Sequence, residues 1–403
     1  MSDTPQWPAF RWIVLIAAAV ILALSMGLLI NGLTAFFVPL EKAFGWQRGD
    51  IALINTFGLI GLAVGGIAMG RIADRFGTLR VGLFGGIVLG LCVLASAHAD
   101  RLWQFYALYL VAGALGGAAF FAPLVALVGN WFKTGAGLAL GIVSAGQAVG
   151  QGGIPLAATV LIAEFGWSGA LTGLGIAILA LVVPLALLMR QPPHTGTAGA
   201  AADDRPPLGN LPHTVVVATI SIAVIGCCTL MAVPLMHLFP LMQGQGIGAA
   251  DAGSVMLVML SLSVVGRIFF GKLADMIGAL PAYITASVWQ TVMVFGFTQF
   301  ESIGSFYLYA MLYGFGYAGV MTGILTTTRV LTRPSRRASA MGVIGASAFI
   351  GHGIGGWQAG MLFDLTGGYT APYAVAAAAG VFNLLVVMTL VLRLRRPQSA
   401  QPA

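Results

Sequence analysis

Hydrophobic residues along this chain form long apolar runs, and short polar or charged stretches separate one run from the next. A membrane-spanning helix needs about 20 apolar residues, and most of these runs are long enough. They are too long and too continuous for the alternating strands of a membrane β-barrel. We therefore expect an all-α membrane protein with twelve transmembrane helices. The predicted segments are 12–38, 51–70, 79–97, 103–129, 136–162, 167–189, 213–240, 250–271, 279–299, 303–328, 338–363 and 371–392.

The amino-acid composition leads to the same class of protein. Hydrophobic residues make up 59% of the 403 residues and charged residues 8%, whereas a soluble domain carries about 25% charged residues. The first apolar run follows Arg11 and is long enough to span, so we expect a retained first span and not a signal peptide. Cys92, Cys227 and Cys228 lie inside apolar runs without metal-binding spacing, and we interpret them as small packing residues.

The segment 191–212 interrupts the apolar pattern near the middle of the chain. Its five prolines, three glycines and cluster of charged residues cannot bury enough apolar surface to fold. We interpret it as a cytoplasmic linker between two six-helix bundles, which are predicted at 1–190 and 213–403.

Lysine and arginine residues are distributed unequally between the two ends of the predicted helices. With the N-terminus in the cytoplasm, fifteen of the nineteen basic residues fall at cytoplasmic ends and three in outer loops. Cytoplasmic loops carry such an excess, so we expect both termini inside and the protein in the cytoplasmic (inner) membrane. The remaining basic residue, Arg267, lies within a predicted span. The net charge of +7 follows from this topology, and no basic stripe for nucleic acid is present.

One phrase occurs twice in the chain, between the second and third span of each half. "GRIADRFG" at 70–77 aligns with "GKLADMIG" at 271–278 at an offset of 201, and it keeps both glycines, the alanine and the aspartate. We expect both phrases to form loops on the same side of the membrane. The halves are then parallel repeats of six spans, which is an architecture of secondary transporters.

The duplicated phrase resembles the loop signature of the major facilitator superfamily. Three further stretches resemble its monocarboxylate and oxalate:formate exchanger branches, namely "FFVPLEKAFGWQRGDIALI" (36–54), "NWFKTGAGLALGI" (130–142) and "GMLFDLTGGY" (360–369). The resemblance runs from about residue 24 to 373. It implies a fold of 6+6 helices with two pseudo-symmetric repeats, whose central cavity opens to each side of the membrane in turn.

The resemblance also implies a gating role for the duplicated phrase, because in the family its contacts latch one state of the carrier. The aspartates can cap the next helix or pair with a basic residue on a neighbouring helix, and the first glycine lets a helix end pack closely. The alternative is a topology anchor with a loop cap. The candidate gating residues are Gly70, Arg71, Asp74, Arg75, Gly77, Gly271, Lys272 and Asp275.

Arg267 is the candidate substrate anchor. It lies four residues before Gly271, about 6 Å from the expected end of its helix, which is within reach of a snorkelling side chain. Its counterpart at the offset of 201 is Gly66, so the other half carries no charge at this place. "RIFFGKLAD" resembles a pattern of the monocarboxylate branch in which this arginine binds the carboxylate. A guanidinium fork matches two carboxylate oxygens, and snorkelling is the alternative.

A proton-carrying acid is missing from the expected place. Many monocarboxylate carriers have an acidic or polar residue one turn before the arginine, and Ser263 stands there in this chain. All twelve acidic residues lie in loops, tails or helix ends, so we expect no carboxylate in the middle of the membrane. This argues against a cationic-drug exporter as well.

Two histidines are the remaining ionisable candidates. His352 lies where oxalate:formate exchangers tend to have a lysine, and it could serve as a weak cation or as a proton site. His237 lies towards the outer end of the seventh span. Each could instead be a hydrogen-bonded packing residue.

Neutral polar residues could also line a cavity. The candidates are Asn31 in the first span and Tyr313 and Tyr317 in the tenth, where the two tyrosines share a helix face at i, i+4. Asn55 and the glutamines of the fifth span are further possibilities. Each of these residues is more simply explained by contacts between helices.

The sequence contains no catalytic constellation, metal-ligand cluster or phosphate loop, so we expect neither an enzyme nor a cofactor. It predicts a monomeric carrier of a small organic anion, most simply a monocarboxylate, that works by H⁺ symport or anion exchange. Export of a hydrophobic compound is the alternative, which the glycine-rich stretch 146–155 favours. A non-transporting sensor is disfavoured because it would normally need an added signalling domain.

Overall fold

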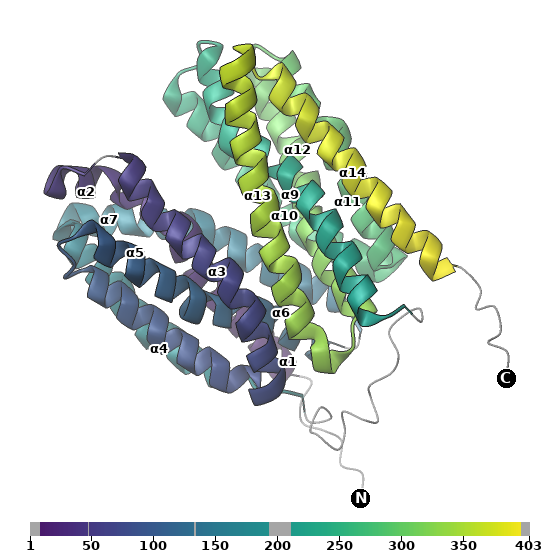
Figure 1. Cartoon of the computed structure of the whole chain (residues 1–403), viewed down its shortest axis with the longest axis horizontal. Coiled ribbons are helices and arrows are strands. Elements are labelled where there is room, and N and C mark those ends of the chain that lie inside the picture. Colours follow the sequence, from purple (N-terminus) through teal and green to yellow (C-terminus); the bar gives the residue numbers. More distant parts are fainter. Residues whose placement is uncertain (1–8, 47, 133, 193–210, 396–403) are drawn as a thin grey trace, which may run out of the picture. The chain divides into compact units, whose positions relative to one another are not determined.

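The computed structural model describes residues 9–46, 48–132, 134–192 and 211–395, and every regular element in them is helical (Figure 1). The elements are α1 (Phe10–Met26), η1 (Gly27–Asn31), η2 (Gly32–Phe36), α2 (Phe37–Phe44), α3 (Arg48–Phe76), α4 (Thr78–Ser96), α5 (Leu102–Val111), η3 (Ala112–Gly116), η4 (Gly117–Ala119), α6 (Phe121–Trp131), α7 (Ala136–Ala186), α9 (His213–Gly244), α10 (Ala249–Ile277), α11 (Ala279–Val294), η6 (Phe295–Gln299), α12 (Ile303–Leu331), η7 (Pro334–Arg336), α13 (Arg337–Thr366) and α14 (Thr370–Arg395).

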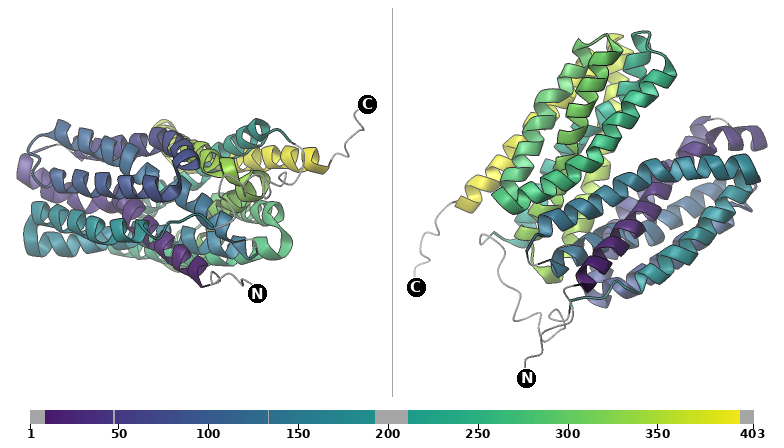
Figure 2. Two further views of the ribbon diagram at one scale, coloured as in Figure 1. Left: turned by 90° about the horizontal axis from the view of Figure 1, so that it is seen from below. Right: turned by 180° about the vertical axis from the view of Figure 1, so that it is seen from behind.

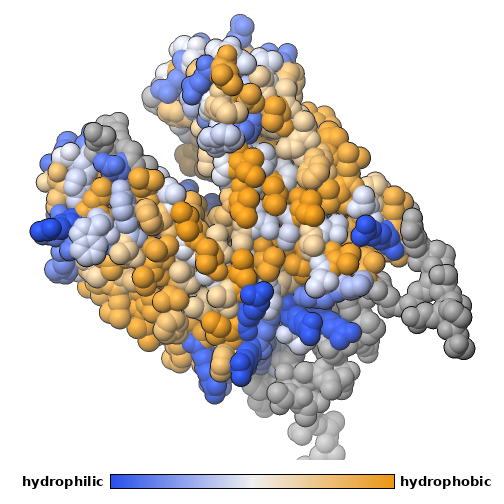
Figure 3. Space-filling view, viewed as in Figure 1, coloured by the Kyte–Doolittle hydropathy of each residue, from blue (hydrophilic) through white to orange (hydrophobic). Residues whose placement is uncertain are grey.

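The prediction of twelve spans is confirmed. Eleven helices in the described ranges are long and apolar enough to cross a membrane, and one of them, α7, runs over 51 residues. Gly166 interrupts α7 with a non-helical backbone at φ 70° and ψ 176°, so α7 contains two spans. On the face seen in Figure 3, hydrophobic side chains cover the flanks of the helices and hydrophilic ones gather towards the helix ends.

Contacts divide the chain into two compact units. The first consists of Met1–Asp203 with Pro334–Ala346, and the second of Asp204–Arg333 with Ser347–Ala403. Most of the predicted linker, residues 193–210, lies outside the described residues. In the second unit α10 packs along α12, α9 packs along α14, and α11 contacts both α12 and α14, as Figure 2 shows from two sides.

The second and fourth spans of each unit cross so closely that glycine is required. A Cβ atom on Gly266 of α10 would lie 2.1 Å from the carbonyl oxygen of Phe315, and one on Gly314 of α12 would lie 2.3 Å from that of Met259. Such distances are far below van der Waals contact, so any side chain there would force the helices apart.

The same crossing occurs in the first unit at the offset of 201. A Cβ atom on Gly65 would lie 2.1 Å from the carbonyl oxygen of Ala114, and one on Gly113 would lie 2.1 Å from that of Gly58. The duplication seen in one short phrase therefore extends to the packing of entire helices.

The first and fourth spans of the first unit are broken, although the sequence predicted continuous spans. α1 passes into the π-helix η1 and the 3₁₀-helix η2, and α5 passes into η3 and η4 in the same way. The Asn55 side-chain amide donates to the carbonyl oxygens of Leu29 and Ile30, both at 3.0 Å, and so partners groups at the break. The corresponding spans of the second unit, α9 and α12, are continuous.

The duplicated phrase is not a loop, as the sequence analysis expected, but the last turns of a helix and the glycine that ends it. α3 continues to Phe76 and α10 continues to Ile277. Gly77 has φ 88° and ψ 148°, and Gly278 has φ 96° and ψ 156°. Side-chain-bearing residues rarely adopt this conformation, which explains why a glycine stands at the end of both copies.

Replacing Gly278 by alanine should destabilise the protein by about 1–3 kcal/mol, because alanine is strained at this positive φ. The expected observation is a lower melting temperature of the purified protein, followed by intrinsic fluorescence. Gly253→Ala is the matched control on the same helix, since no atom lies within 4 Å of a Cβ at this helical glycine. An equal melting temperature for both variants would contradict the role assigned to Gly278.

Candidate functional site

Arg267 lies deeper along its helix than the sequence analysis expected. Because α10 continues to Ile277, Arg267 precedes the helix end by ten residues, which corresponds to about 15 Å at 1.5 Å per residue. The estimate of about 6 Å was wrong because it took Gly271 as the end of the helix. The side chain is 8% exposed.

Hydroxyl groups and aromatic rings surround Arg267. Ser263, one turn earlier on α10, is 1% exposed and donates its hydroxyl to the Leu260 carbonyl oxygen at 2.6 Å. Tyr317 of α12 lies close to both Arg267 and Ser263. The α10–α12 crossing at Gly266 positions this cluster, since Arg267 is the next residue in the chain.

Tyr313 extends the cluster by one turn along α12. Its ring stacks on that of Tyr317, with centroids 5.3 Å apart and planes at 16°. Tyr313 is fully buried, and its hydroxyl has no hydrogen-bond partner within the part of the chain that the structure describes. A buried hydroxyl favours a polar partner, so this site can hydrogen-bond to a further polar group beside the arginine.

The other predicted binding residues lie elsewhere. His237 of α9 hydrogen-bonds to the carbonyl oxygen of Gly356 on α13 at 3.0 Å. Asn31, in the first unit, donates to the carbonyl oxygen of Gln151 at 3.1 Å. His352 of α13 has its contacts on its own helix and on α9. The structure thus brings Arg267, Tyr313 and Tyr317 together, whereas His237 and Asn31 connect helices through backbone carbonyls.

The Asp74 carboxylate caps a helix, but not the one that follows it in the chain. It accepts hydrogen bonds from the backbone N–H of Ala338 at 3.2 Å and of Ser339 at 2.9 Å, and also from the Ser339 hydroxyl. These N–H groups lie in the first turn of α13, where the helix itself offers them no acceptor. The negative charge also complements the positive end of the helix dipole.

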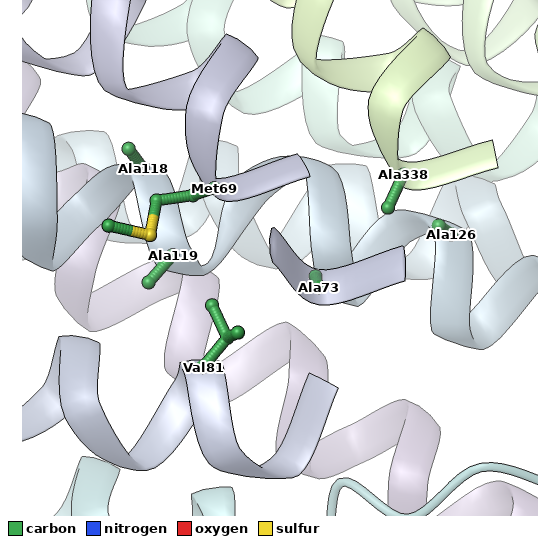
Figure 4. Close-up of a cluster of buried hydrophobic side chains, with 7 residues drawn as sticks. All are labelled: Met69, Ala73, Val81, Ala118, Ala119, Ala126 and Ala338. Carbon is green, nitrogen blue, oxygen red and sulfur yellow. The ribbon is translucent and has the colours of Figure 1, made fainter. Parts of the chain in front are cut away.

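Close packing supports this cap within the first unit. A Cβ on Gly70 would lie 2.5 Å from the Ala338 carbonyl oxygen, and one on Gly342 would lie 2.2 Å from that of Gly66. Figure 4 shows Ala338 within a buried cluster of small side chains of the first unit. The members of this cluster are Met69, Ala73, Val81, Ala118, Ala119, Ala126 and Ala338.

The basic residues in the first copy of the duplicated phrase are exposed, whereas the neighbouring Arg337 forms a hydrogen bond. Arg71 and Arg75 are exposed, and the Arg75 guanidinium lies 5.3 Å from the Phe76 ring centroid. Arg337, at the start of α13, donates to the side-chain oxygen of Asn130. Sequence reasoning missed Asn130 and Ser339. The serine in the first turn of a predicted span was a usable signal, but nothing in the sequence connects it with Asp74.

The second copy of the phrase has a different environment. Lys272 and Asp275 are exposed, whereas Gly271 is buried. Asp275 lies close enough to Arg329 of α12 for electrostatic attraction. This pairing with a basic residue on a neighbouring helix is one of the two contacts that the sequence analysis expected for the aspartates.

Asp74→Ala should destabilise the protein by about 1 kcal/mol, because it removes the acceptor of two first-turn N–H groups. The expected result is a lower melting temperature, with Ser339→Ala showing a smaller decrease and the double variant less than the sum of both. Asp275→Ala, at the exposed position of the second copy, is the matched control with a smaller effect. Wild-type stability of Asp74→Ala would rule out the cap.

Comparison with known proteins places the chain in a family. The model of the Major Facilitator Superfamily matches residues 15–280 and 218–403. An uncharacterized MFS-type transporter of Bacillus subtilis is 23% identical over 91% of this chain and 92% of its own length. Monocarboxylate transporter 13 of Rattus norvegicus is 25% identical over 96% of this chain and 90% of the relative. Human monocarboxylate transporter 11 is 28% identical over 94% of this chain and 83% of its own length.

Solved structures show the same fold. A proton:xylose symporter matches with a TM-score of 0.74 and 13% identity, covering 95% of this chain and 96% of the symporter. A human organic anion transporter matches with a TM-score of 0.73 and 15% identity, covering 95% of this chain and 100% of that protein. The chain is a multi-pass membrane protein with two parallel six-span repeats, and it belongs to the major facilitator superfamily of transporters.

Proposed function

We propose that this protein is a secondary active carrier of a small organic anion, most simply a monocarboxylate, and that it works by alternating access. Transport is coupled to H⁺ or to exchange with a second anion. The carrier resides in the cytoplasmic membrane with both termini in the cytoplasm, as the distribution of basic residues indicates.

The buried Arg267 carries this proposal. Burying a cation within a spanning helix is costly, and a membrane protein retains such a charge for function. The acidic residues of α10, Asp251 and Asp275, lie near its two ends. The phenol groups of Tyr313 and Tyr317 suit a carboxylate, because they add hydrogen-bond donors beside the guanidinium fork without neutralising it.

We also propose that the duplicated phrase has a gating role, and the contacts of Asp74 support it. The capped first turn of α13 involves one carboxylate and three donors, all near the predicted cytoplasmic side. Contacts of this kind are individually weak, at about 0.5–2 kcal/mol, so they can form and break during a transport cycle. We assign to the first copy of the phrase a latch function and to the second copy a supporting role through Asp275.

The anchor can be tested by uptake of labelled monocarboxylates into proteoliposomes. Arg267→Ala should lower the initial rate by at least about tenfold, because a hydrogen bond to a charged group contributes about 1.5–3 kcal/mol. Arg267→Lys keeps the charge but loses the fork, so its rate should lie between those of wild type and Arg267→Ala.

Arg393→Ala, at an exposed position near the end of α14, is the control and should transport at the wild-type rate. Wild-type transport by Arg267→Ala would refute the anchor. Binding that is unchanged when the acid is replaced by its ester or amide would instead favour export of a hydrophobic compound.

A further inference from the structure

Two adjacent cysteines form the centre of a buried polar cluster in the second unit. Cys227 and Cys228 of α9 are both fully buried, with their sulfur atoms 3.8 Å apart. The sequence analysis treated them as packing residues. Their contacts indicate a role beyond packing, because each sulfur atom lies close to a polar side chain of another helix.

Cys228 lies within interaction distance of the imidazole of His352 on α13. The Nδ1 atom of His352 lies 3.2 Å from the carbonyl oxygen of Ala348, which can only accept, so Nδ1 carries the hydrogen of the neutral ring. The Nε2 atom is then an acceptor and is the nitrogen left for the Cys228 thiol. The S–H group of Cys228 can therefore donate to Nε2 in the neutral pair.

The close crossing of α9 and α13 holds this contact. A Cβ on Gly351 would lie 2.6 Å from the carbonyl oxygen of Ile225 and 2.9 Å from the Cβ of Cys228. The Thr229 hydroxyl donates to the Gly351 carbonyl oxygen at 3.1 Å. Because Gly351 and Thr229 directly adjoin the pair in sequence, thiol and imidazole have little freedom to separate.

Further groups extend the cluster behind Cys228. Cys227 donates to the Val224 carbonyl oxygen at 3.3 Å and lies close to Tyr283 of α11. The Tyr283 hydroxyl donates to the side-chain oxygen of Asn383 on α14 at 2.8 Å. Cys227 and Tyr283 are thus the titratable groups that face the pair from α9 and α11, while Asn383 of α14 is neutral. A connected network of this kind can stabilise either position of a shared proton.

We propose that the Cys228 thiol and the His352 imidazole form one proton-sharing pair, which takes up and releases the proton that the carrier moves with its anion. The use of that proton rests on the proposed function, whereas the pair itself does not. When the neutral pair takes up a proton, an N–H bond forms at Nε2 and the pair becomes a thiol beside an imidazolium; release of the proton breaks that N–H bond. Within the neutral pair the S–H bond of Cys228 can also break as an N–H bond forms at Nε2, which gives a thiolate and an imidazolium. Cys227 lies close enough to donate its S–H to that thiolate.

The Cys228–His352 pair could also replace the proton-carrying acid that the sequence lacks near Arg267. The residue one turn before Arg267 is Ser263, and a serine does not titrate in the physiological range. A thiol and an imidazole that interact titrate as a unit, so Cys228 is a positioning residue that sets the proton affinity of His352 and shares its proton.

Infrared spectroscopy tests the pair without any substrate. In the Cys92→Ala, Cys227→Ala protein, Cys228 is the remaining thiol, and its S–H stretching band reports its protonation. We expect this band to disappear at a pH about one unit or more lower with His352 present than in the same protein with His352→Gln, because an imidazolium favours the thiolate. Identical titrations of two folded proteins would overturn the pair.

Transport tests the role of the proton. Cys228→Ala should lower the stimulation of monocarboxylate uptake by an inward proton gradient about tenfold, as His352→Gln does, and the double variant should lose no more than either single one. Cys228→Ser keeps a hydroxyl donor to Nε2 and should recover thermal stability but not the wild-type pH profile. Cys92→Ala, a buried cysteine of α4 in the first unit, is the matched control with a wild-type profile.

A wild-type pH profile for Cys228→Ala would overturn the proton role. If the wild-type protein moves no monocarboxylate at any proton gradient, the proposed function fails and the proton role fails with it. The infrared titration would still decide whether the pair exists.

Discussion

The close crossing of the second and fourth spans is the constraint on which the candidate site depends. In both units a glycine on each helix meets a carbonyl oxygen of the other, which leaves no room for a side chain at the contact. The helices are locked in register, so Arg267 next to Gly266 is held beside Tyr317. A larger residue at Gly266 would separate the helices and move the guanidinium away from Tyr317.

The two units solve the problem of buried polar groups in different ways. The first unit breaks its first and fourth spans, and asparagine side chains such as Asn55 bind carbonyl oxygens beside the break in α1. The second unit keeps the corresponding helices continuous and holds Arg267 on α10 and the Cys228–His352 pair on α9 and α13.

Span count, repeat and family follow from the sequence, because apolar length and a duplicated phrase are local signals. The distance of Arg267 from the end of its helix could not be predicted in this way. α10 continues through "GKLAD" to Ile277, but the apolar pattern that would have indicated this stops at Gly271. The partners of Asp74 and His352 could not be predicted either. Asp74 meets Ser339 and His352 meets Cys228 only because helices remote in sequence cross at glycines, and that packing is a tertiary property.

The repeat of the glycine crossing at Gly65 and Gly266 has an evolutionary consequence. A glycine on each helix secures the crossing in both copies, but the residue that follows the glycine of the second span differs: it is Gly66 in one copy and Arg267 in the other. The charge at this position can therefore change while the glycines of the crossing stay the same.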